Sequence, residues 1–281
     1  MVHNADLREF LRSRRARLQP ETIGLTPAAG RRVPGLRREE LAAMAGVSVD
    51  YYVRLEQGRN LNPSEAVLDA IARALRLDDA ERAHLFHLAR PAPSARRRPP
   101  RRPQRVSPAT YQLLETLDAA ACPALVQGRR MDILAANHTA RALLTDFNAL
   151  PARRRNYARF VFLDENARDL HPEWAKVAAE TVAVLRLAAG RHPDDPELSA
   201  LVGELSVKSP EFRRWWADHQ VVARTTGTKR YRHPLVGDLT LTYQALQLPD
   251  DPDQTLFLYT ATPGTPPHTA LQLLAQWTTA G

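Results

Sequence analysis

Apolar residues in the first third of the chain recur at the three- and four-residue spacing of amphipathic helices. Residues 7–18 place leucines and a phenylalanine among arginines, and residues 64–77 continue from Ser64 with the same spacing. Glycine and proline interrupt residues 19–35, which predicts a loop there. Asp78 or Asp79 begins a further helix. The pattern therefore predicts an all-helical domain over residues 1–90.

Two shorter helices with a glycine between them fill the middle of this domain. The sequence predicts one helix over 36–45, which ends at Gly46, and another over 48–57, which Ser48 caps. Gly46 permits a backbone turn that a Cβ would oppose. This order of helix, tight turn and helix is typical of a helix-turn-helix, whose second helix enters the major groove of DNA.

The two faces of the second helix differ in chemistry. Tyr52 and Leu55 are three residues apart and share a face with Val47, so we expect them to pack in the core. The other face offers apolar, acidic and basic groups to the surroundings. Its residues are Val49, Asp50, Val53 and Arg54, with Tyr51 between the two faces.

The pattern changes after residue 90. Residues 91–106 are dense in proline and arginine and cannot bury a core, so we interpret them as an extended linker, which could also lie along a phosphate backbone. In residues 107–281, a helix-rich middle between early and late strands predicts an α+β domain with an antiparallel sheet. Strand-like runs occupy 123–127, 131–137, 239–248 and 255–261, and helical runs occupy 172–190, 195–206 and 210–220.

The basic charge is confined to the first third of the chain. The net charge is +8, yet residues 106–281 hold 18 basic and 19 acidic side chains, against 21 and 12 in residues 1–105. A GC-rich coding sequence would explain arginine in place of lysine, but it would not confine the excess to one end. The asymmetry predicts that the N-terminal region binds nucleic acid.

The sequence carries little sign of catalysis. It has no G-x-S-x-G, no H-E-x-x-H and no glycine-rich phosphate loop, and the single Cys122 rules out an internal disulfide or a multi-cysteine metal site. No apolar run approaches the roughly 20 residues of a membrane helix, and the N-terminus lacks an apolar signal core. We therefore expect a cytoplasmic protein that is not an enzyme, with no catalytic residues, metal or cofactor.

The stretch LRREELAAMAGVSVDYYVRLEQGR resembles the Cro/C1-like helix-turn-helix of the xenobiotic-response-element regulators. The matching elements are L-A-x-x-A-G-V-S at the turn and L-E-x-G-R at the end of the second helix. The resemblance covers residues 7–90. It implies a five-helix DNA-binding domain with the N-terminal half of the second helix in the major groove.

This resemblance implies a set of DNA contacts. Arg54 could bond both acceptors of a guanine, Asp50 could accept from a cytosine, and Val49 could touch a thymine methyl group. The remaining candidates would contact phosphates, and two of them, in the loop, could also reach a minor groove. They are Ser48, Tyr51 and Arg59, with Arg37 and Arg38 at the start of the preceding helix and Arg31 and Arg32 in the loop.

Several of these residues have a simpler alternative. Asp50 could serve only the helix dipole, and Arg54 could be a solvated charge. Arg31 and Arg32 could equally be free in solvent. We interpret Glu56 as structural, tied to a nearby arginine or backbone amide.

Nearly the whole chain resembles the MmyB-like branch of these regulators, which is common in actinobacteria. The resemblance implies a PAS-like sensor domain around an apolar pocket, and some members are described as holding a fatty-acid-like ligand. The branch often has Trp-Asn-Pro where this chain has Ala136-Asn137-His138, so a large ring is missing here. The segments that carry the resemblance are the loop G-R-R-x-P-G-L-R-R-E-E, G-R-R-M-D-I-L-A-A-N (128–137), R-N-Y-A-R-F-V-F-L-D (155–164), S-P-E-F-R-R-W-W (209–216) and H-P-L-V-G-D-L-T-L (233–241).

Aromatic side chains after residue 107 are the candidates for lining that pocket, since ligand pockets are mainly apolar and aromatic. Such residues more often belong to the core. Because Trp215 and Trp216 are adjacent, their directions on a helix differ by about 100°, so at most one should be deeply buried. The candidates are Phe160, Phe162, Trp174, Trp215, Trp216, Tyr243 and Phe257, with His219 and Arg213 as candidate partners of a carboxylate head group.

We therefore predict a sequence-specific DNA-binding transcription regulator with an all-α helix-turn-helix domain over 1–90 and an α+β PAS-like sensor domain over 107–281. The expected partners are a double-stranded DNA operator, a small apolar ligand and a second copy of the chain, since paired half-sites favour a homodimer. The alternative is a second domain that docks a partner protein and holds no ligand. A closed cavity above about 300 Å³ would favour the sensor, and an exposed tryptophan patch would favour docking.

Overall fold

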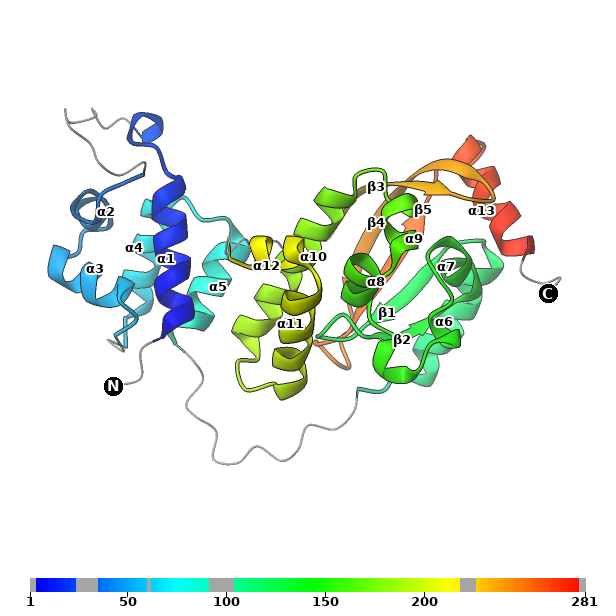
Figure 1. Ribbon diagram of the computed structural model, residues 1–281, viewed down its shortest axis with the longest axis horizontal. Helices are drawn as coiled ribbons and strands as arrows, with labels where there is room; N and C mark the ends of the chain where they lie inside the picture. The colour runs from blue at the N-terminus through cyan, green and yellow to red at the C-terminus, as the bar shows by residue number, and fades with distance from the viewer. Residues whose placement is uncertain (1–3, 24–34, 60–61, 91–103, 218–225, 278–281) are drawn as a thin grey trace.

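A computed structural model describes the chain as two parts, one built of helices alone and one built of helices around a sheet (Figure 1). This confirms the predicted pair of an all-α and an α+β domain. The predictions made for Arg31, Arg32 and His219 lie outside the described residues. The described ranges are 4–23, 35–59, 62–90, 104–217 and 226–277.

The N-terminal part, residues 4–90, is called the head below. Its five α-helices have the predicted order, and fully buried side chains from all five meet in one core. The helices are α1 (Ala5–Arg17), α2 (Arg38–Ala45), α3 (Val49–Glu56), α4 (Glu65–Ala74) and α5 (Asp79–Ala89), with a 3-10 helix η1 (Pro20–Ile23) after α1. The buried residues include Phe10, Leu41, Tyr52, Leu68 and Leu85.

Polar side chains fix the starts of these helices. Ser64 Oγ accepts a hydrogen bond from the Val67 N–H at 3.3 Å at the start of α4. Asp78 accepts one from the Glu81 N–H at 2.8 Å before α5, and Glu81 accepts one from the Asp78 N–H at 3.3 Å. Each bond satisfies a backbone donor that the helix itself leaves unpaired, so both predicted helix starts are confirmed.

The C-terminal domain, residues 104–277, contains an antiparallel five-stranded sheet with the order β2-β1-β5-β4-β3. Leu239, Leu241 and Tyr243 of β4 are buried while the residues between them are exposed, as the alternating pattern predicts. Four of the strands were predicted from the sequence, and β3 was not. The strands are β1 (Ala124–Gln127), β2 (Ile133–Ala136), β3 (Thr226–His233), β4 (Gly237–Gln247) and β5 (Thr255–Thr260).

Helices cover both faces of this sheet. The larger core joins one face to α8, α9, α10, α11 and α13, and a smaller core joins the other face to α6. The helices are α6 (Pro108–Ala119), α7 (His138–Leu143), α8 (Tyr157–Leu163), α9 (Glu165–Leu170), α10 (Trp174–Arg191), α11 (Pro196–Lys208), α12 (Pro210–Ala217) and α13 (Pro266–Trp277). The helical run predicted over 210–220 is described only as far as Ala217.

Asn137 ties three elements together beside the sheet. Its Oδ1 accepts hydrogen bonds from the N–H groups of Ala124 and Ala140 at 3.0 and 2.9 Å. Its Nδ2 donates to the carbonyls of Leu114 and Cys122 at 3.4 and 2.8 Å. Because the side chain is buried, no water replaces these partners. Asn137 therefore holds α6, β1 and α7 in register.

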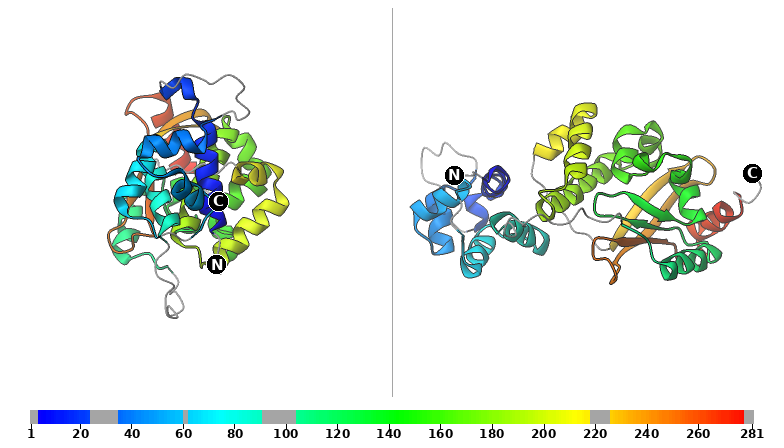
Figure 2. Two further views of the ribbon diagram at one scale, coloured as in Figure 1. Left: turned by 90° about the vertical axis from the view of Figure 1, so that its left-hand side faces the viewer. Right: turned by 90° about the horizontal axis from the view of Figure 1, so that it is seen from below.

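The head and the C-terminal domain touch where α5 lies beside α10 (Figures 1 and 2). Gly190 on α10 meets His84 on α5. A Cβ added at Gly190 would lie 2.6 Å from two atoms of the His84 ring, closer than van der Waals contact allows. The glycine therefore permits an approach that a side chain would prevent.

Candidate DNA-contacting helix and ligand cavity

The turn between α2 and α3 has the geometry that the sequence predicts. Gly46 has a φ of +66°, in the left-handed region, and ends α2. Val47 packs against the head core, and the Ser48 hydroxyl accepts a hydrogen bond from the Tyr51 N–H at 3.2 Å to cap α3. We call α3 the recognition helix.

The outer face of the recognition helix is open to solvent. Val49 is 46 % exposed, and the side chains of Asp50 and Arg54 are also exposed. Asp50 and Arg54 form an i,i+4 ion pair with 3.8 Å between Oδ2 and Nη1. Tyr51 is half-buried against the core. Three of the four predicted contact residues on this helix are thus free to meet a base edge, and Tyr51 lies at the boundary.

The arginines predicted to contact phosphates differ in their surroundings. Arg37 precedes α2 and lies 3.6 Å from Glu39, Nη1 to Oε1. Arg38 pairs with Glu56, although half of its side chain remains exposed. Arg59 follows α3 and is exposed. Arg37 and Arg59 can therefore turn toward an anion at little cost, whereas Arg38 would have to share its guanidinium with Glu56.

Glu56, at the end of α3, holds the recognition helix to its neighbours. Its carboxylate is 2 % exposed and accepts a hydrogen bond from Arg15 Nε of α1 at 2.7 Å, in addition to its pair with Arg38 of α2. Burial alone would raise the pKa of Glu56, but the hydrogen bonds and charges of both arginines bring the pKa below its ordinary value. The prediction that Glu56 is structural is confirmed.

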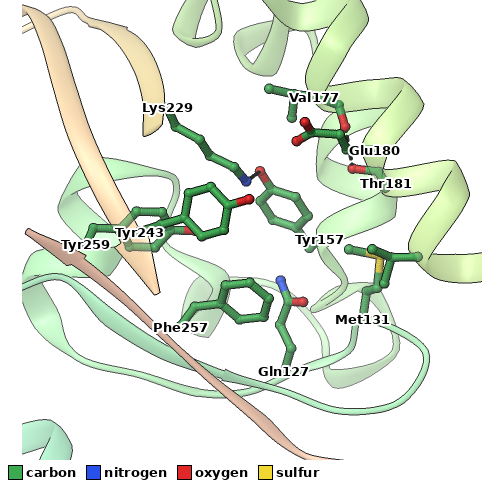
Figure 3. Close-up of a pocket in the computed structure, with 11 residues that line it drawn as sticks. Gln127, Met131, Tyr157, Val177, Glu180, Thr181, Lys229, Tyr243, Phe257 and Tyr259 are labelled. Atoms are coloured by element: carbon green, nitrogen blue, oxygen red, sulfur yellow. Dashed lines mark hydrogen bonds between the residues drawn. The ribbon is translucent and has the colours of Figure 1, made fainter. Parts of the chain in front are cut away.

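The predicted ligand residues fall into two groups. Phe162, Trp174 and Trp215 pack on one another with ring centroids 5.7 to 6.3 Å apart, and Trp216 stacks on Phe212 at 5.5 Å. This aromatic cluster and the buried Phe160 belong to the core of the C-terminal domain. Tyr243 and Phe257 line a cavity (Figure 3), whereas Arg213 is exposed and does not belong to that lining.

That cavity opens between the sheet and α10. Its volume is about 60 Å³. The cavity is therefore narrow and partly open. It is lined by Gln127, Met131, Tyr157, Val177, Glu180, Thr181, Val184, Lys229, Tyr243, Phe257 and Tyr259.

Lys229 supplies the positive charge of the cavity. Its Nζ lies 5.4 Å from the centre of the Tyr157 ring, 5.2 Å from that of Tyr243 and 3.5 Å from the Tyr157 hydroxyl. Glu180 on α10 lies on the same side of the cavity (Figure 3). Among the residues described as lining the cavity, Lys229 is the only basic one, so it is the group that an acidic ligand would meet.

Burial also shifts the pKa values of two tyrosines in this region. It raises the pKa of Tyr157 and, against the charge of Lys229, raises that of Tyr259 to about 12. His171 packs behind the cavity against Tyr231, with ring centroids 5.2 Å apart. Burial, helped by the charge of Lys229, lowers the pKa of His171 to about 3. The cavity therefore presents neutral rings, with Lys229 as its basic group and Glu180 as its acidic group.

Most of the cavity residues were not predicted from the sequence. Lys229 belongs to β3, which the sequence pattern missed, and Tyr157 and Tyr259 come from segments about a hundred residues apart. One signal was available: only three of the 39 basic residues are lysines, at 176, 208 and 229. Lys229 is the one of these three that lines the cavity, whereas Lys176 and Lys208 are exposed.

No helix in the described ranges is long and apolar enough to cross a membrane. In the same ranges, no three His, Cys, Asp or Glu side chains gather as a metal site.

Comparisons with known protein families agree with this geometry. A helix-turn-helix domain family matches residues 6–85, which places the chain among DNA-binding transcription regulators. A second family, the MmyB-like transcription regulator ligand binding domain, matches residues 106–274, more than half of the chain. The chain therefore belongs to the MmyB-like transcription regulators. Both families are regulator domains and not enzyme families. A search of curated proteins found no match.

Proposed function

We propose that this regulator responds to a small amphipathic acid, of the fatty-acid-like kind, whose carboxylate binds Lys229 and whose apolar part lies among the cavity tyrosines and Phe257. The observation that carries this proposal is the position of the Lys229 ammonium between the rings of Tyr157 and Tyr243. An ammonium group flanked by neutral hydroxyls favours a carboxylate, which accepts hydrogen bonds from each of them.

Glu180 makes the proposal more specific. Its carboxylate lies near Lys229 and would repel an acidic head group (Figure 3). Glu180 would therefore weaken the binding of a carboxylate at Lys229. Glu180→Gln should then tighten the binding of a carboxylate ligand while leaving that of the matching alcohol unchanged.

We also propose which residues contact the DNA operator. Val49, Asp50 and Arg54 would read base edges, with Ser48, Tyr51, Arg37, Arg38 and Arg59 near phosphates. Two copies of the chain, in the cytoplasm, would place two recognition helices on successive half-sites, about one helical turn of DNA apart. Light scattering on the free protein tests this proposal, because a dimer has twice the mass of a single chain.

The test of the ligand proposal compares dodecanoate with dodecanol in titration calorimetry. Lys229→Met should weaken dodecanoate binding at least about tenfold, because a hydrogen bond to a charged group is lost, and should leave dodecanol binding nearly unchanged. Lys208→Met is the matched control, since Lys208 is an exposed lysine on α11 that pairs with Glu204 at 2.8 Å. Equal loss of both ligands, or no loss, would contradict the assignment.

Two observations favour the docking alternative. The cavity volume of about 60 Å³ lies below the roughly 300 Å³ that would favour a sensor. Trp215 and Trp216 pack into the aromatic cluster and form no exposed patch, but Trp277 and Leu273 on α13 are 65 % and 53 % exposed. Native mass spectrometry of the purified protein separates the two functions. A small molecule released on denaturation supports the sensor, and an empty cavity that no acyl chain stabilises supports docking.

A further inference from the structure

α10 borders the ligand cavity and also touches the head. Val177, Glu180, Thr181 and Val184 line the cavity at the i, i+3, i+4, i+7 spacing of one helix face. Gly190 lies six residues after Val184, about 9 Å further along the helix axis. One rigid element therefore spans the distance between the proposed ligand and the DNA-binding domain.

The contact between Gly190 and His84 leaves no space for a further side chain. His84 is buried at 2 % exposure, and its ring packs edge-on against Phe10 of α1 with the centroids 5.1 Å apart. A Cβ at Gly190 would come within 2.6 Å of the His84 ring. Because the ring is held from behind by the core of the head, a shift of α10 cannot be absorbed at this point.

Arg186 lies one turn earlier on α10 and packs on Trp216 of α12, within the same domain. The Arg186 guanidinium is 4.3 Å from the centre of the Trp216 ring and is almost fully buried. Burial lowers the pKa of Arg186 to about 10, against the opposing influence of Asp6 and Glu9 on α1. The charge on α10 thus interacts with acidic groups of the head across the junction.

The cavity is too small for an acyl chain in its present form. Its volume is about 60 Å³, whereas ligand pockets usually enclose about 300 Å³ or more. An acyl chain that enters the cavity fully would therefore displace a wall. The wall opposite the sheet is α10, whereas the strands are fixed to one another by backbone hydrogen bonds.

We propose that α10 couples the cavity to the head: filling the cavity displaces α10, breaks the contact between Gly190 and His84, and releases the head from the C-terminal domain. This inference rests on the proposed ligand function. The recognition helix α3 lies on the side of the head away from α10 (Figures 1 and 2). Release therefore changes how two heads are oriented on paired half-sites without uncovering α3 itself.

The coupling is reciprocal. If the ligand favours the released state, then any change that releases the head must tighten ligand binding by the same factor. Gly190→Leu is such a change, because its side chain cannot fit against His84 and lies far from the cavity lining. Gly203→Leu is the matched control, since a Cβ at Gly203 on α11 meets nothing within 4 Å.

The experiment uses the full-length wild-type, Gly190→Leu and Gly203→Leu chains. X-ray scattering gives the radius of gyration with and without dodecanoate, and calorimetry gives the dodecanoate affinity. We expect dodecanoate to expand the wild-type and Gly203→Leu chains. Gly190→Leu should be expanded without ligand and should bind dodecanoate about tenfold more tightly than the control. Hydrogen exchange of the α5 amides provides a second measure of release that does not depend on overall size.

Each other outcome counts against the inference. An expanded Gly190→Leu chain with the control's affinity would show that the head and cavity are uncoupled, even though the ligand proposal survives. A compact Gly190→Leu chain, with α5 still protected, would show that this contact does not hold the domains together. Failure of dodecanoate to bind any of the three chains would overturn the ligand proposal, and this inference with it.

Discussion

The recognition helix and the ligand cavity differ in where their functional side chains come from and in which direction they point. Val49, Asp50 and Arg54 come from six consecutive residues, point into solvent and rest on a packed core. The cavity residues come from strands and helices more than a hundred residues apart and point inward. Changes on the outer face of α3 should therefore alter function alone. Changes around the cavity should alter function and stability together, because the same side chains fill space between the sheet and α10.

The largest expected effect is on the scaffold of the C-terminal domain. Asn137→Ala removes four hydrogen bonds and leaves two buried N–H groups and two carbonyls without this partner. We expect the free energy of unfolding of this domain to fall by about 3–4 kcal/mol, measured by denaturant titration. Asn166→Ala, at an exposed site on α9, is the control and should change it little. Equal stability of both variants would show that Asn137 does not organise the domain.

The matching change in the head is Glu56→Gln, which leaves Arg15 without a carboxylate partner. We expect the head to lose about 2–3 kcal/mol at neutral pH, because one side of a buried ion pair is removed. The pKa of Glu56 is lowered in the folded protein, so its contribution is present above about pH 4.5 and disappears as the pH falls through the lowered value.

The difference in the free energy of unfolding between Glu56→Gln and wild type should therefore disappear at low pH. Thermal melts at several pH values measure it. Glu65→Gln is the control, since its pair with Arg90 is at the surface and worth little. A difference in stability that persists at low pH would contradict the role of the Glu56 charge.

Arg54→Ala tests whether the outer face of α3 contributes to DNA binding without contributing to stability. Binding to a site selected from random DNA should weaken by about 1–3 kcal/mol and lose preference at one base, while the melting temperature stays unchanged. Arg73→Ala, an exposed arginine on α4, is the control. If Arg54→Ala weakened selected and scrambled DNA equally, the residue would be a phosphate contact and not a base contact.

The effect of His171 is the smallest near neutral pH and grows as the pH falls, within the C-terminal domain. Burial lowers the pKa of His171 to about 3 from 6.5, so the unfolded chain binds more protons between these values and stability falls as the pH drops below 6.5. The slope from this group should approach about 1.4 kcal/mol per pH unit.

His171→Leu should flatten that slope, whereas His87→Leu, at an exposed position on α5, should not. Melts of each variant between pH 4 and pH 7 make the comparison. A slope that persists in His171→Leu would assign the dependence to other groups.

The sequence predicted the head far better than the cavity, for a physical reason. Gly46, Ser48 and the spacing of Tyr52 and Leu55 are local signals, and the structure has each of them in the expected place. The cavity depends on which distant segments meet. Sequence spacing distinguishes a buried aromatic residue from an exposed one, but it does not distinguish a core ring such as Phe162 from a cavity ring such as Tyr243.

β3 escaped prediction because its pattern is weak. Only Tyr231 and His233 are buried in it, and arginines lie between and beside them, so neither hydrophobicity nor alternation marks a strand. β3 forms by pairing with β4. The alternating residues of β4 do predict a strand from the sequence. Lys229, the main ligand candidate, was missed together with the strand that carries it.

The most direct test of the whole account is the affinity for a selected DNA site, measured with and without dodecanoate, in the wild type and in Lys229→Met. The account predicts that dodecanoate changes the dissociation constant of the wild-type complex about fivefold or more and leaves that of Lys229→Met unchanged. A wild-type protein that binds dodecanoate in its cavity and holds DNA with the same affinity in both conditions would contradict it.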